Sequence, residues 1–348
     1  MILNQTPIRT SKNYKINNIE LDLEFPNKIE EFGGLTISGD TSNFNISDEA
    51  SKIPLKYGNG LESQIFEKGN QNIKISETKT GLLYLDFNFN FNEENHDLIE
   101  NIEIDANTKS KTTIYIKYMS DDNFECYHNG IIRVNAKANS KTNIVVVNML
   151  NNKSNNLLSI ENNLQENARV DYTIVDFGGK TSITNYYSNI KENGAKANIN
   201  TIYLGAGNQV FDINYIAELF GENTETNIEV QGALKDEARK NFKGTIDFKK
   251  GSKKAKGDEN EFCMLLSNKA KSKALPMLLC TEEDVEGNHS SAAGKIEDDK
   301  LFYIMSRGLS EKDAMKLIVK AKFNKILETI KDEELKQEIV EEIDKRLD

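Results

Sequence analysis

The sequence of 348 residues contains no tryptophan, four prolines, three cysteines and three histidines. It also lacks any run near the roughly 18 to 20 consecutive apolar residues that a membrane-spanning helix needs, so we expect no membrane partner. The cysteines are odd in number and form no C-x-x-C pair, which argues against a disulfide framework. The first residues show no basic-then-apolar signal pattern. Together these absences predict a protein of the reducing cytoplasm.

Acidic residues outnumber basic ones, with 55 Asp and Glu against 44 Lys and Arg and a net charge of -11. Nucleic acids are held by clustered cations, because each contact neutralises a phosphate. The sequence has no long basic stripe, so we expect no nucleic-acid partner.

Proline is missing between Pro54 and Pro276, whereas asparagine is abundant over the same stretch. A long region without proline suits continuous strand ladders, since each proline removes a backbone donor. Asparagine tolerates the left-handed backbone conformation and favours turns. The sequence therefore predicts many strands joined by tight turns, with a change of character near residues 270–290.

A pattern of a small residue, a few polar residues and a β-branched run recurs along this stretch. Its copies start at Ala106, Ala138, Ala168 and Ala195, at spacings of 32, 30 and 27 residues. Short strands at a quasi-period near 30 are typical of stacked rungs that bury their apolar faces against one another. We therefore predict a β-solenoid over about 30–265, with a large β-sandwich as the alternative.

After about residue 297 the pattern becomes helical. The stretch from Ser310 to Asp313 has the form of a capping box. It precedes one helical face made of Ala314, Leu317, Ile318 and Ala321. Asp332 can cap a second helix, whose apolar residues are Leu335, Ile339, Ile343 and Leu347. These helices either cap an end of the solenoid or dock a partner, and the pattern alone leaves both readings open.

Recognisable catalytic motifs are absent from the sequence. The histidines, His96, His128 and His289, form no H-E-x-x-H pair. There is no phosphate-binding P-loop and no G-x-S-x-G elbow. These absences exclude a zinc-hydrolase helix, a P-loop ATPase and a nucleophile elbow.

One cluster of possible metal ligands lies where the strands give way to the helices. Cys280, several carboxylates and His289 fall within about ten residues there, and all are residue types that bind iron. Cys280 and Cys263 follow or interrupt apolar runs, so we expect both to be small buried side chains. Cys126, beside a tyrosine and a histidine, is the cysteine that the pattern leaves free to be exposed.

An ordered set of fragments carries a family resemblance. The fragments are Asn241-Phe-Lys-Gly-Thr-Ile246, Leu265-Leu-Ser267, Pro276, Asp284-Val-Glu-Gly-Asn-His289, Gly294-Lys-Ile296 and Leu301-Phe-Tyr-Ile-Met-Ser-Arg307. This set resembles the SufB/SufD family of iron–sulfur cluster assembly scaffold proteins. The resemblance is specific over about 240–325 and looser through the repeats.

The resemblance implies a mainly β fold, a right-handed parallel β-helix core with a small C-terminal α-helical domain. The corresponding division is an N-terminal segment at 1–29, the β-helix at 30–268, and a C-terminal region at 269–348 whose helices dock the SufC ABC-type ATPase. The resemblance implies a non-catalytic scaffold that meets a second SufB/SufD-like subunit and holds a transient iron–sulfur cluster at their interface, with no stably bound cofactor. Residues of the docking region are Phe302, Tyr303, Arg307, Leu317 and Ile318.

Within the family the chain is more similar to SufD than to SufB. SufB-type chains carry a cysteine at a place that falls near Glu261 here, with Cys263 close by. They also carry Glu-His-Glu, where this chain has a serine after the histidine. SufD-type chains keep the histidine alone, so the resemblance makes His289 the expected ligand for a nascent cluster. Glu261 and Cys263 are the secondary ligand candidates.

Two alternatives remain. Short family members form minimal homodimeric scaffolds that work with SufC alone, and in such a chain Cys263 or Glu261 matters more. The remote alternative is a β-helix enzyme acting on polysaccharide. It is disfavoured by the lack of tryptophan for sugar stacking and of rung-aligned acidic and arginine residues.

Overall fold

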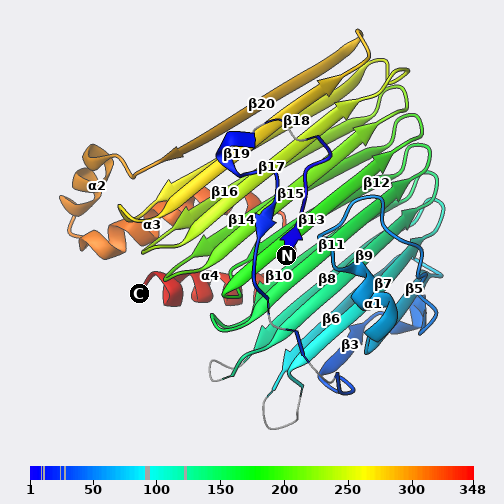
Figure 1. Ribbon diagram of the computed structural model, residues 1–348, viewed down its shortest axis with the longest axis horizontal. Helices are drawn as coiled ribbons and strands as arrows, with labels where there is room; N and C mark the ends of the chain where they lie inside the picture. Colours follow the sequence, from blue (N-terminus) through cyan, green and yellow to red (C-terminus); the bar gives the residue numbers. More distant parts are fainter. Residues whose placement is uncertain (9, 11, 24, 27–28, 91–94, 121–123) are drawn as a thin grey trace.

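The protein is a β-solenoid built from two nine-stranded sheets (Figure 1). The computed structural model describes residues 1–8, 10, 12–23, 25–26, 29–90, 95–120 and 124–348. The chain alternates between the sheets, so that each turn of the solenoid gives one strand to each. This arrangement confirms the predicted solenoid and excludes the β-sandwich alternative.

Sheet 1 consists of β3 (Leu35–Gly39), β6 (Gly81–Phe89), β8 (Lys111–Ser120), β10 (Lys141–Met149), β12 (Arg169–Asp176), β14 (Lys196–Gly205), β16 (Glu225–Leu234), β18 (Ala255–Leu265) and β20 (Val285–Gly294). Sheet 2 consists of β4 (Phe44–Ser47), β5 (Gln71–Glu77), β7 (Asp97–Ala106), β9 (Tyr127–Ala136), β11 (Asn155–Leu164), β13 (Thr181–Ile190), β15 (Val210–Leu219), β17 (Arg239–Phe248) and β19 (Lys271–Cys280). The strands pair in parallel, except that β3 and β4 pair antiparallel with β6 and β5.

The sequence repeats mark one corner of the solenoid. Each copy begins just before a strand of sheet 1, and the strand starts Lys111, Lys141, Arg169 and Lys196 are aligned in register. The same corner holds a residue with a left-handed backbone in six successive turns, at Lys109, Asn139, Asn167, Gly194, Asn223 and Lys254. Three of the six are asparagines, as expected for a conformation that most side chains avoid.

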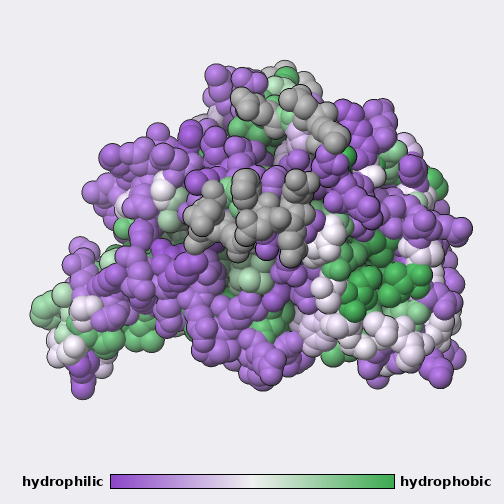
Figure 2. Space-filling view, turned by 90° about the horizontal axis from the view of Figure 1, so that it is seen from below, coloured by the Kyte–Doolittle hydropathy of each residue, from purple (hydrophilic) through white to green (hydrophobic). Residues whose placement is uncertain are grey.

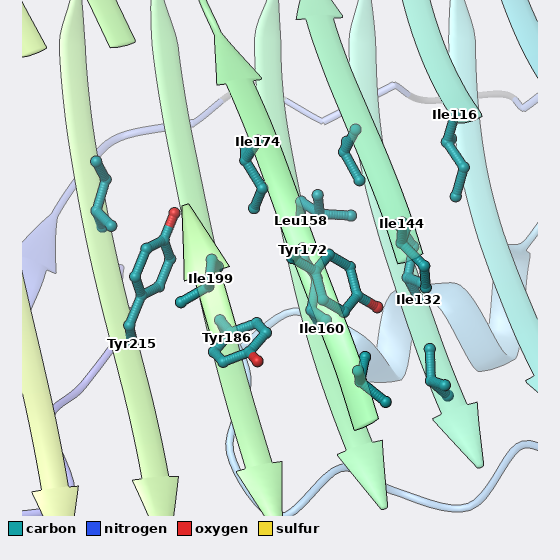
Figure 3. Packing of buried hydrophobic residues seen from close by; sticks show 14 of the residues in the cluster. Ile116, Ile132, Ile144, Leu158, Ile160, Tyr172, Ile174, Tyr186, Ile199 and Tyr215 are labelled. Atoms are coloured by element: carbon teal, nitrogen blue, oxygen red, sulfur yellow. The ribbon is translucent and has the colours of Figure 1, made fainter. Parts of the chain in front are cut away.

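The interior of the solenoid is packed with aliphatic and aromatic side chains from both sheets. Figure 3 shows isoleucines and tyrosines of neighbouring strands interleaved in this space. Tyr186 makes edge-to-face contacts with both Tyr172 and Tyr215, at centroid distances of 5.5 and 5.6 Å. Each large apolar side chain buried in this way contributes about 1.5 to 3 kcal/mol. Stacking of successive turns is therefore what holds the solenoid together.

In the part of the chain that the structure describes, four α-helices accompany the sheets: α1 (Glu62–Lys68), α2 (Asp298–Met305), α3 (Glu311–Leu327) and α4 (Glu333–Leu347). The predicted caps are confirmed, since the Ser310 side chain accepts from the Asp313 amide at 3.1 Å. Asp332 accepts from the Leu335 amide at 3.0 Å in the same way. Among the described residues, no helix is both long and apolar enough to cross a membrane.

Helices α3 and α4 pack on the outer face of sheet 1. Their buried residues join a second core with outward side chains of the strands, among them Val145, Val147, Ile202 and Leu204, and with Phe177, which follows β12. The predicted apolar face of α4 is buried as expected, whereas that of α3 is partly wrong. Leu317 and Ala321 are exposed, and the buried stripe runs instead through Ala314, Val319, Phe323, Ile326 and Leu327. Packing against sheet 1 determines which side of α3 is buried, and the periodicity of the local sequence does not reveal this contact.

The N-terminal segment lies across the outer face of sheet 2, on the side away from α3 and α4 (Figure 1). Its two short strands, β1 (Ile2–Leu3) and β2 (Ile19–Glu20), pair antiparallel. Asn4 donates to the Asp212 carboxylate at 2.7 Å, and Lys243 forms a fully buried ion pair with the same carboxylate. These contacts fix the segment to the sheet, so both outer faces of the solenoid are covered.

Candidate functional site at the open end of the solenoid

The last turn leaves one end of the solenoid uncovered. β20 and β19 terminate the two sheets, and within the described residues no further strand pairs with their outer edges. Every residue of β20 from Glu286 to Ala293 is exposed, in contrast to the buried strands before it. We call the inner faces of β19 and β20 the open end.

His289 lies on the inner face of this open end. Two neighbours establish its orientation, because alternate residues of a strand share a face. A Cβ added to Gly287 would meet the interior side chain of Phe248 at 3.0 Å. The Ser291 hydroxyl donates to the interior carboxylate of Glu261 at 2.8 Å. His289 falls between these two, so its imidazole faces inward while remaining exposed.

The two secondary candidates lie one strand deeper, beside His289. Glu259, Glu261 and Cys263 alternate along β18 and are all buried. In register, Glu259 is opposite His289, Glu261 is opposite Ser291, and Cys263 is opposite Ala293. The structure therefore brings together the three residues that the sequence singled out.

Glu261 is held by a buried ion pair. Its Oε1 accepts from the Lys240 ammonium at 2.6 Å, and both side chains are fully buried. Lys240 also donates to the Lys273 carbonyl at 3.3 Å, while Ser291 occupies the other Glu261 oxygen. The carboxylate has its partners in this state, so it can bind a metal only after the pair with Lys240 is broken.

Cys263 is fully buried in the same layer. Burial raises the pKa of its thiol, an effect that the nearby Lys240 ammonium only partly offsets. A thiol becomes a metal ligand or nucleophile as the thiolate, and burial in apolar surroundings disfavours that form. Cys263 is therefore unreactive until the end of the solenoid rearranges.

Glu259 is the site residue that sequence reasoning missed. It is fully buried, and neither carboxylate oxygen has a hydrogen-bond partner among the described residues. Burial, with the charge of Glu261 as a second cause, raises its pKa to about 8. The spacing of two residues between Glu259 and Glu261 was the available signal, since it places both carboxylates on one face of a strand.

The other cysteines and histidines lie elsewhere. Cys280 is exposed, so the expectation of burial is wrong: it ends β19, where no further turn covers it. Cys126 is buried within the solenoid rather than exposed. The His128 ring is also inside, bonded to Asn156 at 2.6 Å and to Glu100 at 3.2 Å. These contacts make His128 a residue of the core.

The residues expected to dock a partner fall on the helical end. Phe302 and Tyr303 of α2 are 73% and 60% exposed, and Leu317 of α3 is 47% exposed. The Arg307 guanidinium lies over the Tyr303 ring at 5.2 Å, whereas Ile318 is partly buried against the helices and sheet 1. Figure 2 shows hydrophobic residues at the extremity formed by α2, and a larger hydrophobic patch towards the opposite end of the same face.

The chain by itself offers few ligands to a metal. Among the residues that the structure describes, no group of three His, Cys, Asp or Glu side chains is arranged to hold a metal ion. The open end presents one exposed imidazole above a buried layer of carboxylates and a thiol. Such an arrangement can contribute ligands to a shared centre rather than enclose one.

Comparison with known proteins agrees with this geometry. A family model described as "SUF system FeS cluster assembly, SufBD core domain" matches residues 89–322, more than half of the chain. The chain is 25% identical over 180 residues to the iron–sulfur cluster assembly protein SufD of Bacillus subtilis, covering 52% of this chain and 41% of that protein. It is 22% identical over 192 residues to SufB of the same organism, with 55% and 41% covered. The expected resemblance to SufD is thus confirmed.

A further relative is an archaeal protein. The iron–sulfur cluster assembly SufBD family protein PH1385 of Pyrococcus horikoshii is 34% identical over 165 residues, covering 47% of this chain and 36% of that protein. The chain thus spans about two-fifths of the length of these relatives. Because the family model covers the strands from β7 to β20, the open end and much of α3, the chain belongs to the SufB/SufD family of iron–sulfur cluster assembly proteins.

Proposed function

We propose that this chain is a non-catalytic scaffold subunit of a cytoplasmic SufB–SufC–SufD-type complex. The observation that carries the proposal is the exposed His289 on the uncovered last strand, directly above a buried thiol and carboxylates. A neutral imidazole binds iron through one nitrogen. The nascent iron–sulfur cluster, which is cargo rather than a resident cofactor, is built at this end.

The second subunit covers the open end. A free ten-residue edge such as β20 exposes unpaired backbone groups, which a strand from another chain can satisfy. A SufB-like partner that adds its own last strand there would bring its ligands next to His289. This arrangement supplies the ligands that one chain lacks.

The helical end docks the SufC-like ATPase. Phe302, Tyr303 and Leu317 give it an exposed apolar surface, and Arg307 adds a cation beside them. Helices α3 and α4 share a core with sheet 1, which contains both β18 and β20. A displacement of these helices on nucleotide binding is therefore transmitted to the strands that carry Glu261, Cys263 and His289.

A homodimeric scaffold with SufC alone is the second candidate function. The presence of Cys263 and Glu261 in this same chain, beneath His289, favours it, because a single chain must then supply every ligand. Their burial requires the Lys240–Glu261 pair to open before either can reach a cluster.

Anaerobic co-purification of the tagged chain from its native cell, with mass spectrometry of the bound proteins, tests the proposal. We expect a SufC-like ATPase together with a cysteine-bearing SufB-like chain. Recovery of the ATPase with only this chain in two copies would favour the homodimer. Recovery of neither would refute a Suf-type scaffold.

His289→Ala tests the role of the imidazole, and Asn288→Ala is its matched control on the outer face of β20. We expect H289A to impair cluster delivery in cells while its unfolding midpoint is unchanged, and N288A to behave as wild type. Normal delivery by H289A would show that the imidazole has no role in cluster building.

A further inference from the structure

Glu259 has no structural explanation within the fold. A buried carboxyl normally has hydrogen-bond partners, because leaving such a group unsatisfied carries a large desolvation cost. Its neighbour Glu261 has three, Lys240, Ser291 and Tyr203. Glu259 is equally buried, yet both of its oxygens are unpartnered among the described residues.

The space for this carboxylate is provided by a glycine on the opposite sheet. A Cβ added to Gly244 of β17 would lie 2.0 Å from Oε1 of Glu259. The carboxylate therefore reaches across the interior and lies against the Gly244 backbone. Pro276, the register partner of Gly244 on β19, belongs to the last turn. The carboxylate is thus only one turn below the open end.

The following turn places His289 beside Glu259. The two residues are register partners on adjacent parallel strands, which lie about 4.8 Å apart. Both side chains face inward, and beyond His289 there is only the open end. A carboxylate oxygen and an imidazole nitrogen are a usual ligand pair for divalent iron and similar metals.

We propose that Glu259 and His289 together bind a divalent first-row metal ion, Fe²⁺ in the cell, at the open end of the isolated chain. This inference rests on the proposed function and deepens it: iron is received by this subunit before the second subunit covers the end. The metal ion displaces to solvent the proton that burial keeps on the Glu259 carboxyl near neutral pH, and the resulting carboxylate supplies the negative charge that an imidazole alone lacks. Water completes the coordination until the partner contributes its own ligands.

Titration of the full-length chain with Co²⁺ under anaerobic conditions tests the site. Calorimetry gives the affinity, and the paramagnetically shifted ring-proton resonance of a Co²⁺-bound imidazole identifies histidine ligation. We expect one Co²⁺ per chain. Glu259→Gln and His289→Ala should each weaken binding about tenfold or more.

Asp258→Asn is the matched control, because Asp258 is the neighbouring carboxylate on the outer face, bonded to Asn288 at 2.9 Å. Its Co²⁺ affinity should stay within about twofold of wild type. Gly244→Ala is a second variant that alters no ligand. Its added methyl group displaces the Glu259 carboxylate, so it should also weaken binding while the shifted imidazole resonance persists at saturation.

Wild-type Co²⁺ affinity in E259Q, or the absence of saturable binding by the wild-type chain, would overturn the site. Neither result bears on the scaffold role, because recovery of the ATPase and second subunit does not depend on metal binding by the isolated chain. Failure to recover those partners, with Co²⁺ binding intact, would instead overturn the proposed function and leave a metal site of another purpose.

Discussion

Replacing either partner of the buried Lys240–Glu261 pair is expected to lower the free energy of unfolding by about 3 to 5 kcal/mol. The two charges are 2.6 Å apart and fully buried, so each single variant leaves the other charge without a counter-ion or solvent. Lys240→Met and Glu261→Gln keep the shape of the side chains. The cost therefore measures electrostatics rather than a cavity.

The double variant K240M/E261Q is expected to be within about 2 kcal/mol of wild type, because it removes both charges together. The single costs sum to about 6 to 10 kcal/mol, so the double-mutant cycle should give a coupling of at least about 4 kcal/mol. The assay is guanidinium unfolding followed by circular dichroism. Hydrogen exchange of peptides from β17 to β20 localises the effect.

A matched pair on the same strands provides the control. Lys256 and Glu286 are 2.9 Å apart on β18 and β20, but their side chains are 52% and 69% exposed. The K256M/E286Q cycle should show no coupling above the error of the measurement, because solvent screens an exposed pair. Additive costs at the buried pair, or equal couplings in the two cycles, would refute the claim that Glu261 is restrained by Lys240.

Three further predictions concern the helices and the core. Phe323→Ala should cost about 3 to 5 kcal/mol and release α3 from sheet 1, whereas the exposed Phe302→Ala should cost under about 0.5 kcal/mol, both measured by chemical unfolding. Asp332→Ala removes the α4 cap and the bond from Tyr84 at 2.7 Å, and should cost about 1 to 2 kcal/mol in the same assay; an unchanged unfolding midpoint would contradict the assigned cap. Burial raises the pKa of Asp176 from 3.8 to about 6, so its carboxyl favours folding below pH 4 and opposes it above pH 6. The free energy of unfolding of Asp176→Asn, relative to that of the wild type, should therefore increase by on the order of 3 kcal/mol between pH 4 and pH 7. Parallel plots of unfolding free energy against pH for the two proteins would disprove this.

The fold was predictable because its signals are local and repeated. The starts at Ala106, Ala138, Ala168 and Ala195 all fall at one corner, where each turn must adopt the same backbone path. Several copies of the repeat support the same prediction, so an irregular copy does not change the predicted fold. Caps at Ser310 and Asp332 were equally predictable, since they depend on the nearest three residues.

The site was only partly predictable because it depends on where a strand lies in the stack. Cys280 and Cys263 have similar apolar neighbours in sequence, yet one is exposed on the last turn and the other is buried one turn earlier. The pairing of Lys240 with Glu261 joins different sheets. A local sequence pattern does not show whether another turn of the solenoid follows, and a following turn is what buries the side chains of a strand.

The contrast between the two ends of the solenoid sets a limit on how far it can polymerise. Repeating turns with two bare ends would add copies head to tail without limit, as filaments do. Here the first strands, β3 and β4, are short, with five and four residues, and run antiparallel to their neighbours. Only the β19 and β20 end offers ten-residue edges to a further strand among the described residues. When two such molecules pair through these edges, neither edge is left for a third molecule. Their association therefore stops at a closed pair.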